Sequence, residues 1–120
     1  MRIQKDYNNR FNNGVKYIIN YINNDEIAIS NYITGVYLFG SVAKGNNRFD
    51  SDIDILICFS DTIKQVPDYK RKIRMIKSDL SYINDDIPEI DVKIFIGNDW
   101  LTDMSQFCCE IRKDGIQIWH

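Results

Sequence analysis

The chain has 120 residues, a formal net charge of −2 at pH 7 and 44% hydrophobic residues. This length is typical of one domain with one hydrophobic core, so we expect a single domain over residues 1–120. The small negative charge argues against nucleic acid or an anionic membrane as a partner held by bulk charge. Because no apolar run approaches the ~20 residues of a membrane span, and the N-terminus lacks a signal peptide's apolar segment, we expect a cytoplasmic protein.

The N-terminal half predicts a helix followed by two strands. Apolar residues at helical spacing mark an amphipathic helix over about residues 6–24: Phe11, Val15, Ile18, Ile19 and Ile22. Residues 25–34 are ambiguous between a helical turn and a loop. The elements expected next are a strand over 35–39, a short helix or turn over 41–45, a polar loop over 46–50 and a strand over 53–59.

The next segment predicts a helix over about residues 67–84, with Pro67 in its first turn. Its apolar stripe consists of Tyr69, Ile73, Ile76, Leu80 and Ile83. The other face is basic, with Lys70, Arg71, Lys72, Arg74 and Lys77. This face could bind RNA or an acidic partner, but a solvated helix face is the simpler interpretation because Asp68 and Asp79 dilute the charge.

The C-terminal part predicts a strand over 90–96, a last helix and a final strand over 116–119. Asp99 is expected to cap the helix, and Gly115 to end it as helix-terminal glycines commonly do. The residues expected to face inward from this helix are Leu101, Met104, Cys108 and Ile111. This order of elements predicts an α/β (α+β) fold, a small mixed β-sheet of about four strands with helices mainly on one face.

Two carboxylates open the strand over 53–59. Asp52 and Asp54 are two residues apart, so an extended strand puts them on one face, opposite Ile53 and Ile55. Like charges on one face repel, and a divalent cation would relieve this; oxygen ligands of this kind suit Mg²⁺. The alternative is that both are solvated acids at a strand end.

A glycine-containing turn precedes the carboxylates. Gly40-Ser41 follows an apolar strand directly, and a glycine there lets backbone amides approach and hold a phosphate. An ordinary strand-end turn is the alternative. The spacing from Gly40 to Gly45 matches a Walker A loop, but the following residue is Asn46 rather than lysine, so that motif is excluded.

Three further charged residues complete the candidate site. Asp91 alternates with the apolar residues of the strand over 90–96, so it faces Asp52 and Asp54 if the two strands are neighbours. Lys44 and Arg48 lie between the turn and the carboxylates, where either could meet a phosphate or could be a solvated loop cation.

The three cysteines are Cys58, Cys108 and Cys109. Reduced, partly buried thiols are the expected state in a chain that is not secreted. A redox role for the adjacent Cys108-Cys109 pair is a weaker alternative, and no Cys-x-x-Cys spacing supports a zinc site.

The sequence LFGSVAKG followed by SDIDILI, with the later Asp91, resembles the signature of the DNA polymerase β-like nucleotidyltransferases. The exact residues of the two segments resemble those of the minimal nucleotidyltransferases of prokaryotes. The resemblance runs from about Phe11 to the C-terminus. It implies the polymerase β-like fold and catalytic, metal-binding roles for Asp52, Asp54 and Asp91, with two Mg²⁺ ions. It also implies that Gly40, Ser41, Lys44 and Arg48 bind the phosphates of ATP or another nucleoside triphosphate.

The resemblance also implies a biological role. Members of this group are often antitoxins paired with HEPN ribonuclease toxins, so a HEPN-type partner and transfer of AMP to a hydroxyl of that protein are expected. Two alternatives stay open. The chain could neutralise its partner by binding without catalysis, or it could modify a small molecule such as an aminoglycoside.

Overall fold

The computed structural model describes residues 2–24, 29–45, 51–82 and 86–119. Within these residues the helices are α1 (Arg2–Ile22), α2 (Gly40–Lys44), α3 (Tyr69–Leu80) and α4 (Gln106–Asp114). The strands are β1 (Ile33–Phe39), β2 (Ile53–Phe59), β3 (Ile90–Ile96) and β4 (Ile116–Trp119). Short 3₁₀ segments are η1 (Ser30–Tyr32), η2 (Asp61–Gln65) and η3 (Asp99–Leu101).

The strands form one mixed sheet in the order β3-β2-β1-β4. β1 pairs antiparallel with both β2 and β4, whereas β2 and β3 are parallel. A parallel pair needs a crossover connection, and η2 with α3 supplies it between β2 and β3. The predicted α/β class and the four-stranded mixed sheet are therefore confirmed.

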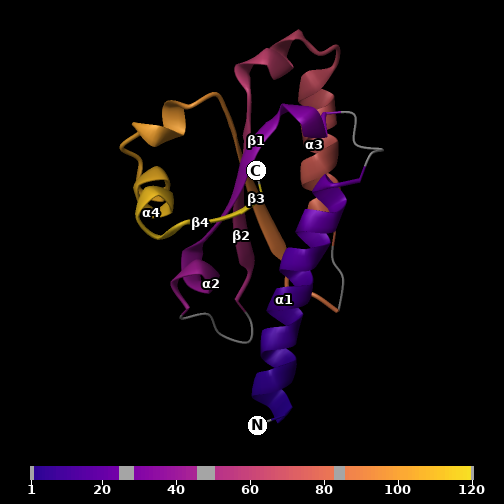
Figure 1. Ribbon diagram of the computed structural model, residues 1–120, viewed down its shortest axis with the longest axis vertical. Helices are drawn as coiled ribbons and strands as arrows, with labels where there is room; N and C mark the ends of the chain where they lie inside the picture. The colour runs from indigo at the N-terminus through magenta and orange to yellow at the C-terminus, as the bar shows by residue number, and fades with distance from the viewer. Residues whose placement is uncertain (1, 25–28, 46–50, 83–85, 120) are drawn as a thin grey trace.

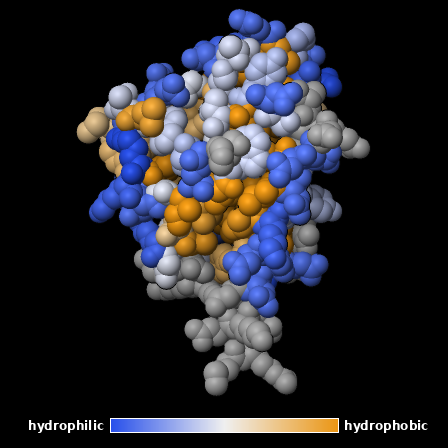
Figure 2. All heavy atoms as spheres, in the orientation of Figure 1, coloured by the Kyte–Doolittle hydropathy of each residue, from blue (hydrophilic) through white to orange (hydrophobic). Residues whose placement is uncertain are grey.

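The two long helices, α1 and α3, cover one face of the sheet (Figure 1). Their apolar stripes pack on the alternate side chains of β2 that the sequence assigned to this face. The buried residues include Ile18 and Ile22 of α1, Ile73, Ile76 and Leu80 of α3, and Ile53, Ile55, Ile57 and Phe59 of β2. In Figure 2, apolar side chains also gather at the surface beside α1, bordered by hydrophilic side chains.

A second, smaller core lies on the opposite face of the sheet, under α4 and η3. It contains Phe39, Leu56 and Cys58 of the strands together with Trp100, Cys108 and Ile111. The rings of Tyr37 and Trp100 are 5.0 Å apart between centroids. The helices are thus mainly on one face, as predicted, but α4 lies on the other face (Figure 1). Asp54 belongs to this second face, because it alternates with Ile53 and Ile55 of the first core.

Several predicted boundaries are shifted at the N-terminal end. α1 begins at Arg2 and ends at Ile22, and within the ambiguous segment η1 leads directly into β1, which begins at Ile33 rather than at residue 35. Ile29 and Ile33 are buried in the first core, which explains why the chain turns there. The predicted polar loop over 46–50 lies outside the described residues, as does Ile83.

Pro67 does not lie in the first turn of α3, so that prediction is wrong. η2 follows β2, and Asp68 then adopts a left-handed conformation with φ of 58°, which cannot continue a helix. α3 begins at Tyr69, and its first backbone bond runs from the N–H of Lys72 to the carbonyl of Asp68 at 3.0 Å.

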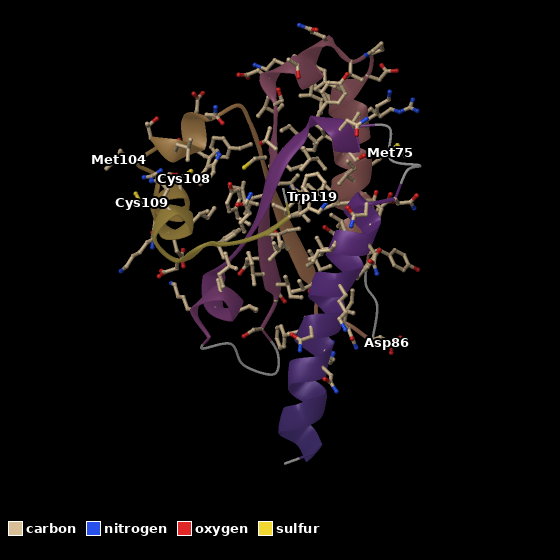
Figure 3. All side chains as sticks on the ribbon, viewed as in Figure 1. Met75, Asp86, Met104, Cys108, Cys109 and Trp119 are labelled. Carbon is tan, nitrogen blue, oxygen red and sulfur yellow. The ribbon has the colours of Figure 1, made fainter. Side chains whose placement is uncertain are left out.

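The prediction that Asp99 caps the last helix is also wrong. Asp99 opens η3, and Ser105 caps α4 by accepting the backbone N–H of Cys108 at 3.4 Å. Leu101 and Met104 are 49% and 81% exposed rather than inward, and Met104 projects from the molecule in Figure 3. The burial of Trp100 requires the separate turn, because the chain must leave the second core before α4 begins.

Gly115 ends α4 as predicted, but in extended backbone (φ −65°, ψ 142°) rather than in the left-handed form. Its N–H donates to the carbonyl of Ile111 at 2.8 Å, and β4 follows directly. Among the residues described, no helix combines the length and apolar character required to cross a membrane.

Candidate functional site

Two of the three predicted carboxylates, Asp54 and Asp91, come together at the end of the sheet where β2 and β3 begin, and Asp52 lies just before β2. Asp54 and Asp91 are directly opposed in the parallel pair, and neighbouring strands lie ~4.8 Å apart. The register is fixed at its start by the N–H of Ile53, which donates to the carbonyl of Glu89 at 2.8 Å. Asp52 and Asp91 are exposed, whereas Asp54 is half-buried.

The site around Asp54 is strongly negative. The pKa of Asp54 is raised to about 6, chiefly by burial and then by the negative charges of Asp91, Asp52 and Glu110. Lys93 opposes this shift but does not cancel it. The carboxylates therefore repel one another in the absence of a cation.

Asp91 has a cationic neighbour on its own strand. The Lys93 ammonium lies 3.8 Å from Oδ2 of Asp91, and the two side chains are about half exposed. In water-exposed surroundings such a pair is weak, so Asp91 is available to a stronger cation.

The glycine turn contacts the carboxylates directly. Phe39 opposes Asp54 in the antiparallel β1–β2 pair, and Gly40 follows with φ of 74°. A Cβ on Gly40 would overlap Oδ2 of Asp54, so only glycine fits here on both steric and conformational grounds. Ser41, partly buried, stands in the first turn of α2. The turn and the carboxylates are thus one structural unit.

The remaining predicted cations have different positions. Lys44 ends α2 and donates from Nζ to Oε1 of Glu110 on α4 at 2.6 Å. This hydrogen bond raises the pKa of Lys44 above its usual value. Arg48 lies outside the described residues.

Glu110 is the residue of this site that the sequence did not identify. Its partner Lys44 is 66 positions away, and the contact exists because α2 and α4 lie side by side at this end of the sheet (Figure 1). No local spacing signals such a contact. In the structure Glu110 is partly buried, and the buried residues Cys108 and Ile111 flank it on α4.

The donor set suits Mg²⁺. Carboxylate oxygens are the hard ligands that this ion prefers, and a cation would reverse the repulsion that contributes to the raised pKa of Asp54. In the described part of the chain, no group of three or more His, Cys, Asp or Glu residues forms a ready metal-binding cluster. Mg²⁺ commonly takes only one or two protein carboxylates and completes its shell with substrate phosphates and water, so the pair Asp54 and Asp91 with Asp52 nearby is compatible with it.

The cysteines lie in and beside the second core. All three are free thiols; Cys58 and Cys108 are buried, and Cys109 is partly exposed (Figure 3). Burial raises the pKa of the Cys58 thiol to about 12, which keeps it protonated and unreactive.

The sequence profile of the family described as "Polymerase beta, Nucleotidyltransferase" matches residues 16–120 of the chain. No curated protein matches it. Among solved structures, a candidate nucleotidyltransferase from Sulfolobus solfataricus has a TM-score of 0.53 and 24% identity, covering 96% of this chain and 83% of that one. This likeness supports the fold.

A second solved structure, a toxin–antitoxin with AMP-PNP, has a TM-score of 0.47 and 20% identity, covering 89% of this chain and 71% of that one. At this level of similarity it carries no inference about the present chain. The family match, by contrast, spans all the described strands and every described residue of the candidate site. The chain therefore belongs to the polymerase β nucleotidyltransferase family.

Proposed function

We propose that this nucleotidyltransferase is Mg²⁺-dependent and moves AMP from ATP to a hydroxyl of a protein acceptor, breaking the α–β phosphoanhydride bond and releasing pyrophosphate. We further propose that it is the minimal nucleotidyltransferase antitoxin of a HEPN-type toxin. Family membership supports the reaction class. The acceptor and the biological role rest on the resemblance carried by LFGSVAKG and SDIDILI.

One observation carries the proposed chemistry. Asp54 opposes Asp91 on the neighbouring strand and also lies against Gly40 of the glycine turn, Gly40-Ser41, which we call the phosphate turn. A triphosphate held by the turn would therefore lie beside the carboxylates. Positioning of this kind, with electrostatic stabilisation of the transferred phosphorus, supplies most of the catalysis in phosphoryl-type transfer.

Each residue then has a distinct role. Asp52, Asp54 and Asp91 would hold Mg²⁺, two ions by the family resemblance. Bound there, Mg²⁺ would neutralise phosphate charge and lower the pKa of the attacking hydroxyl. The Gly40 N–H and the Ser41 hydroxyl donate to phosphate oxygens, and Asp91 accepts the proton of the acceptor hydroxyl. Lys44 and Arg48 supply positive charge to the phosphates.

The test is intact mass spectrometry of the protein encoded by the neighbouring gene. It is incubated with this chain, Mg²⁺ and each of the four ribonucleoside triphosphates in turn. We expect a mass gain of one AMP with ATP, and no gain with the double variant Asp52→Ala, Asp54→Ala. Asp99→Ala, which removes an exposed carboxylate of η3, is the matched control and should retain transfer.

The other outcomes separate the alternatives. Stable binding of the two proteins without any mass gain would indicate an antitoxin that acts by contact. Modification of an aminoglycoside in a parallel incubation, with the protein unmodified, would indicate a small-molecule acceptor.

A further inference from the structure

Both lysines described at the site are already paired with carboxylates. Lys44 Nζ is 2.6 Å from Oε1 of Glu110, and Lys93 Nζ is 3.8 Å from Oδ2 of Asp91. The first pair is the closer one, and it is also the more protected, since the Lys44 and Glu110 side chains are 38% and 29% exposed. Neither ammonium is therefore free for an incoming phosphate.

Lys44 belongs to the phosphate turn by its position on α2. It stands three residues after Ser41 and four after Gly40, so these residues share a face of the helix. Helical side chains lean toward the N-terminus, which directs Lys44 back over the turn. The ion pair with Glu110 is thus located where the triphosphate of the proposed function would lie.

Glu110 adds a fourth negative charge to the site. Its carboxylate is close enough to contribute to the raised pKa of Asp54, alongside Asp91 and Asp52. Within the described part of the site, four carboxylates therefore face two ammonium groups, so this part carries a net negative charge. A metal-free triphosphate, itself strongly negative, is repelled by such a site.

We propose that Glu110 is a positioning residue that competes with the triphosphate for Lys44, and so selects the Mg²⁺-bound nucleotide over the free nucleotide. Binding requires Lys44 to exchange the Glu110 carboxylate for a phosphate oxygen. Mg²⁺ held by Asp52, Asp54 and Asp91 would lower the repulsion that otherwise opposes this exchange. This inference rests on the proposed nucleotide site and adds a residue of α4 to it.

The opposite role predicts the opposite result. If Glu110 merely anchored Lys44 in a binding-ready position, its removal would leave Lys44 disordered and weaken nucleotide binding. If it competes, its removal releases Lys44 and strengthens binding. The sign of the change therefore distinguishes the two roles.

The experiment is calorimetric titration of ATP and of inorganic triphosphate, each with Mg²⁺ and each with EDTA. The variants are Glu110→Gln, which keeps the shape of the side chain without its charge, Lys44→Gln, and the double variant. For Glu110→Gln we expect the Kd for ATP with Mg²⁺ to fall about two- to fivefold, the range corresponding to a partly exposed ion pair. The fall should be larger in EDTA. In the Lys44→Gln background the Glu110 substitution should change the Kd by less than about twofold.

The control for net charge is Asp61→Asn. Asp61 lies 3.8 Å from Lys64 in an ion pair. It follows the C-terminal end of β2, whereas Asp54 is near the start of that strand, so the two residues are roughly 20 Å apart along the strand. The substitution should leave the Kd unchanged. Thermal unfolding of every variant is the check that the fold is kept, and α4 should stay in place because Cys108 and Ile111 anchor it in the second core.

Weaker or unchanged binding by Glu110→Gln, with normal binding by the unsubstituted protein, overturns this inference and leaves the proposed function intact. A tightening that is as large without Lys44 as with it overturns the inference as well, because Glu110 would then act through its field alone. If neither protein binds ATP or triphosphate, the inference and the proposed function both fail.

Discussion

Replacing Asp54 with asparagine should stabilise the metal-free protein. Asp54 has its pKa raised from 3.8 to about 6, so the folded state favours the protonated carboxyl. A shift of about two units corresponds to roughly 3 kcal/mol at a pH above both values. Because Asp54 is only half-buried, solvent screening reduces this to about 1–2 kcal/mol, which is a rise in Tm of about 4–8 °C for a domain of this size.

The pH dependence follows from the same shift. The folded protein binds the Asp54 proton more tightly than the unfolded chain does, so this contribution to stability is complete below pH 3.8 and is lost as the pH rises through about 6. Asparagine does not titrate. The stability advantage of Asp54→Asn should therefore be largest above about pH 7 and should close as the pH falls toward about 4.

The assay is thermal and urea unfolding in EDTA across this pH range, repeated with Mg²⁺. Mg²⁺ should stabilise the unsubstituted protein, since a cation relieves the repulsion, and should stabilise the variant less. Asp99→Asn, at an exposed position on η3, should change the free energy of unfolding by less than about 0.5 kcal/mol. A variant that is less stable in EDTA at neutral pH, or a difference that does not depend on pH, would show that Asp54 is not under electrostatic stress.

Two further substitutions test the turn and the cap of α4. Gly40→Ala should abolish nucleotide binding and lower the free energy of unfolding by at least about 2 kcal/mol, because its Cβ would overlap the Asp54 carboxylate at a positive φ. The control Gly45→Ala has a φ of 75° but open space around it, so it should lower the free energy of unfolding by about 1 kcal/mol. Similar losses for the two variants in urea unfolding would contradict the steric argument. Ser105→Ala should lower the free energy of unfolding by about 1 kcal/mol in the same assay, because it removes the N-cap of α4. The control Ser78→Ala, on the exposed face of α3, should change it by less than about 0.5 kcal/mol. Equal effects of the two variants would refute the capping role.

The sequence predicted well those features that depend on strand periodicity. In β2 and β3 the period of two determined which side chains face the first core, and Asp54 and Asp91 consequently lie on the other face. The alternation does not specify that the two strands are neighbours. Their pairing depends on the crossover through α3, and the resemblance to a known family supplied that expectation.

The errors occur where tertiary packing decides the local structure. Leu101 and Met104 fit an apolar stripe with Cys108 by spacing, yet Trp100 is the side chain that enters the second core. The chain therefore turns at η3 and restarts its helix at Ser105. The Lys44–Glu110 pair is a contact of the same type, because it arises from the packing of α2 against α4 and leaves no local signal.

The second core gives this packing a functional meaning. Cys108 and Ile111 anchor α4 on the face of the sheet that also carries Asp54, and Glu110 lies between them in sequence. The position of the Glu110 carboxylate is therefore set by apolar burial, while its charge acts on Lys44 and Asp54. Loosening the second core should thus alter the charge balance of the site without touching any of the residues proposed to hold metal or phosphate. The two faces of the sheet have separate tasks: the face under α1 and α3 supplies most of the buried apolar core, and the face under α4 fixes the electrostatics of the site.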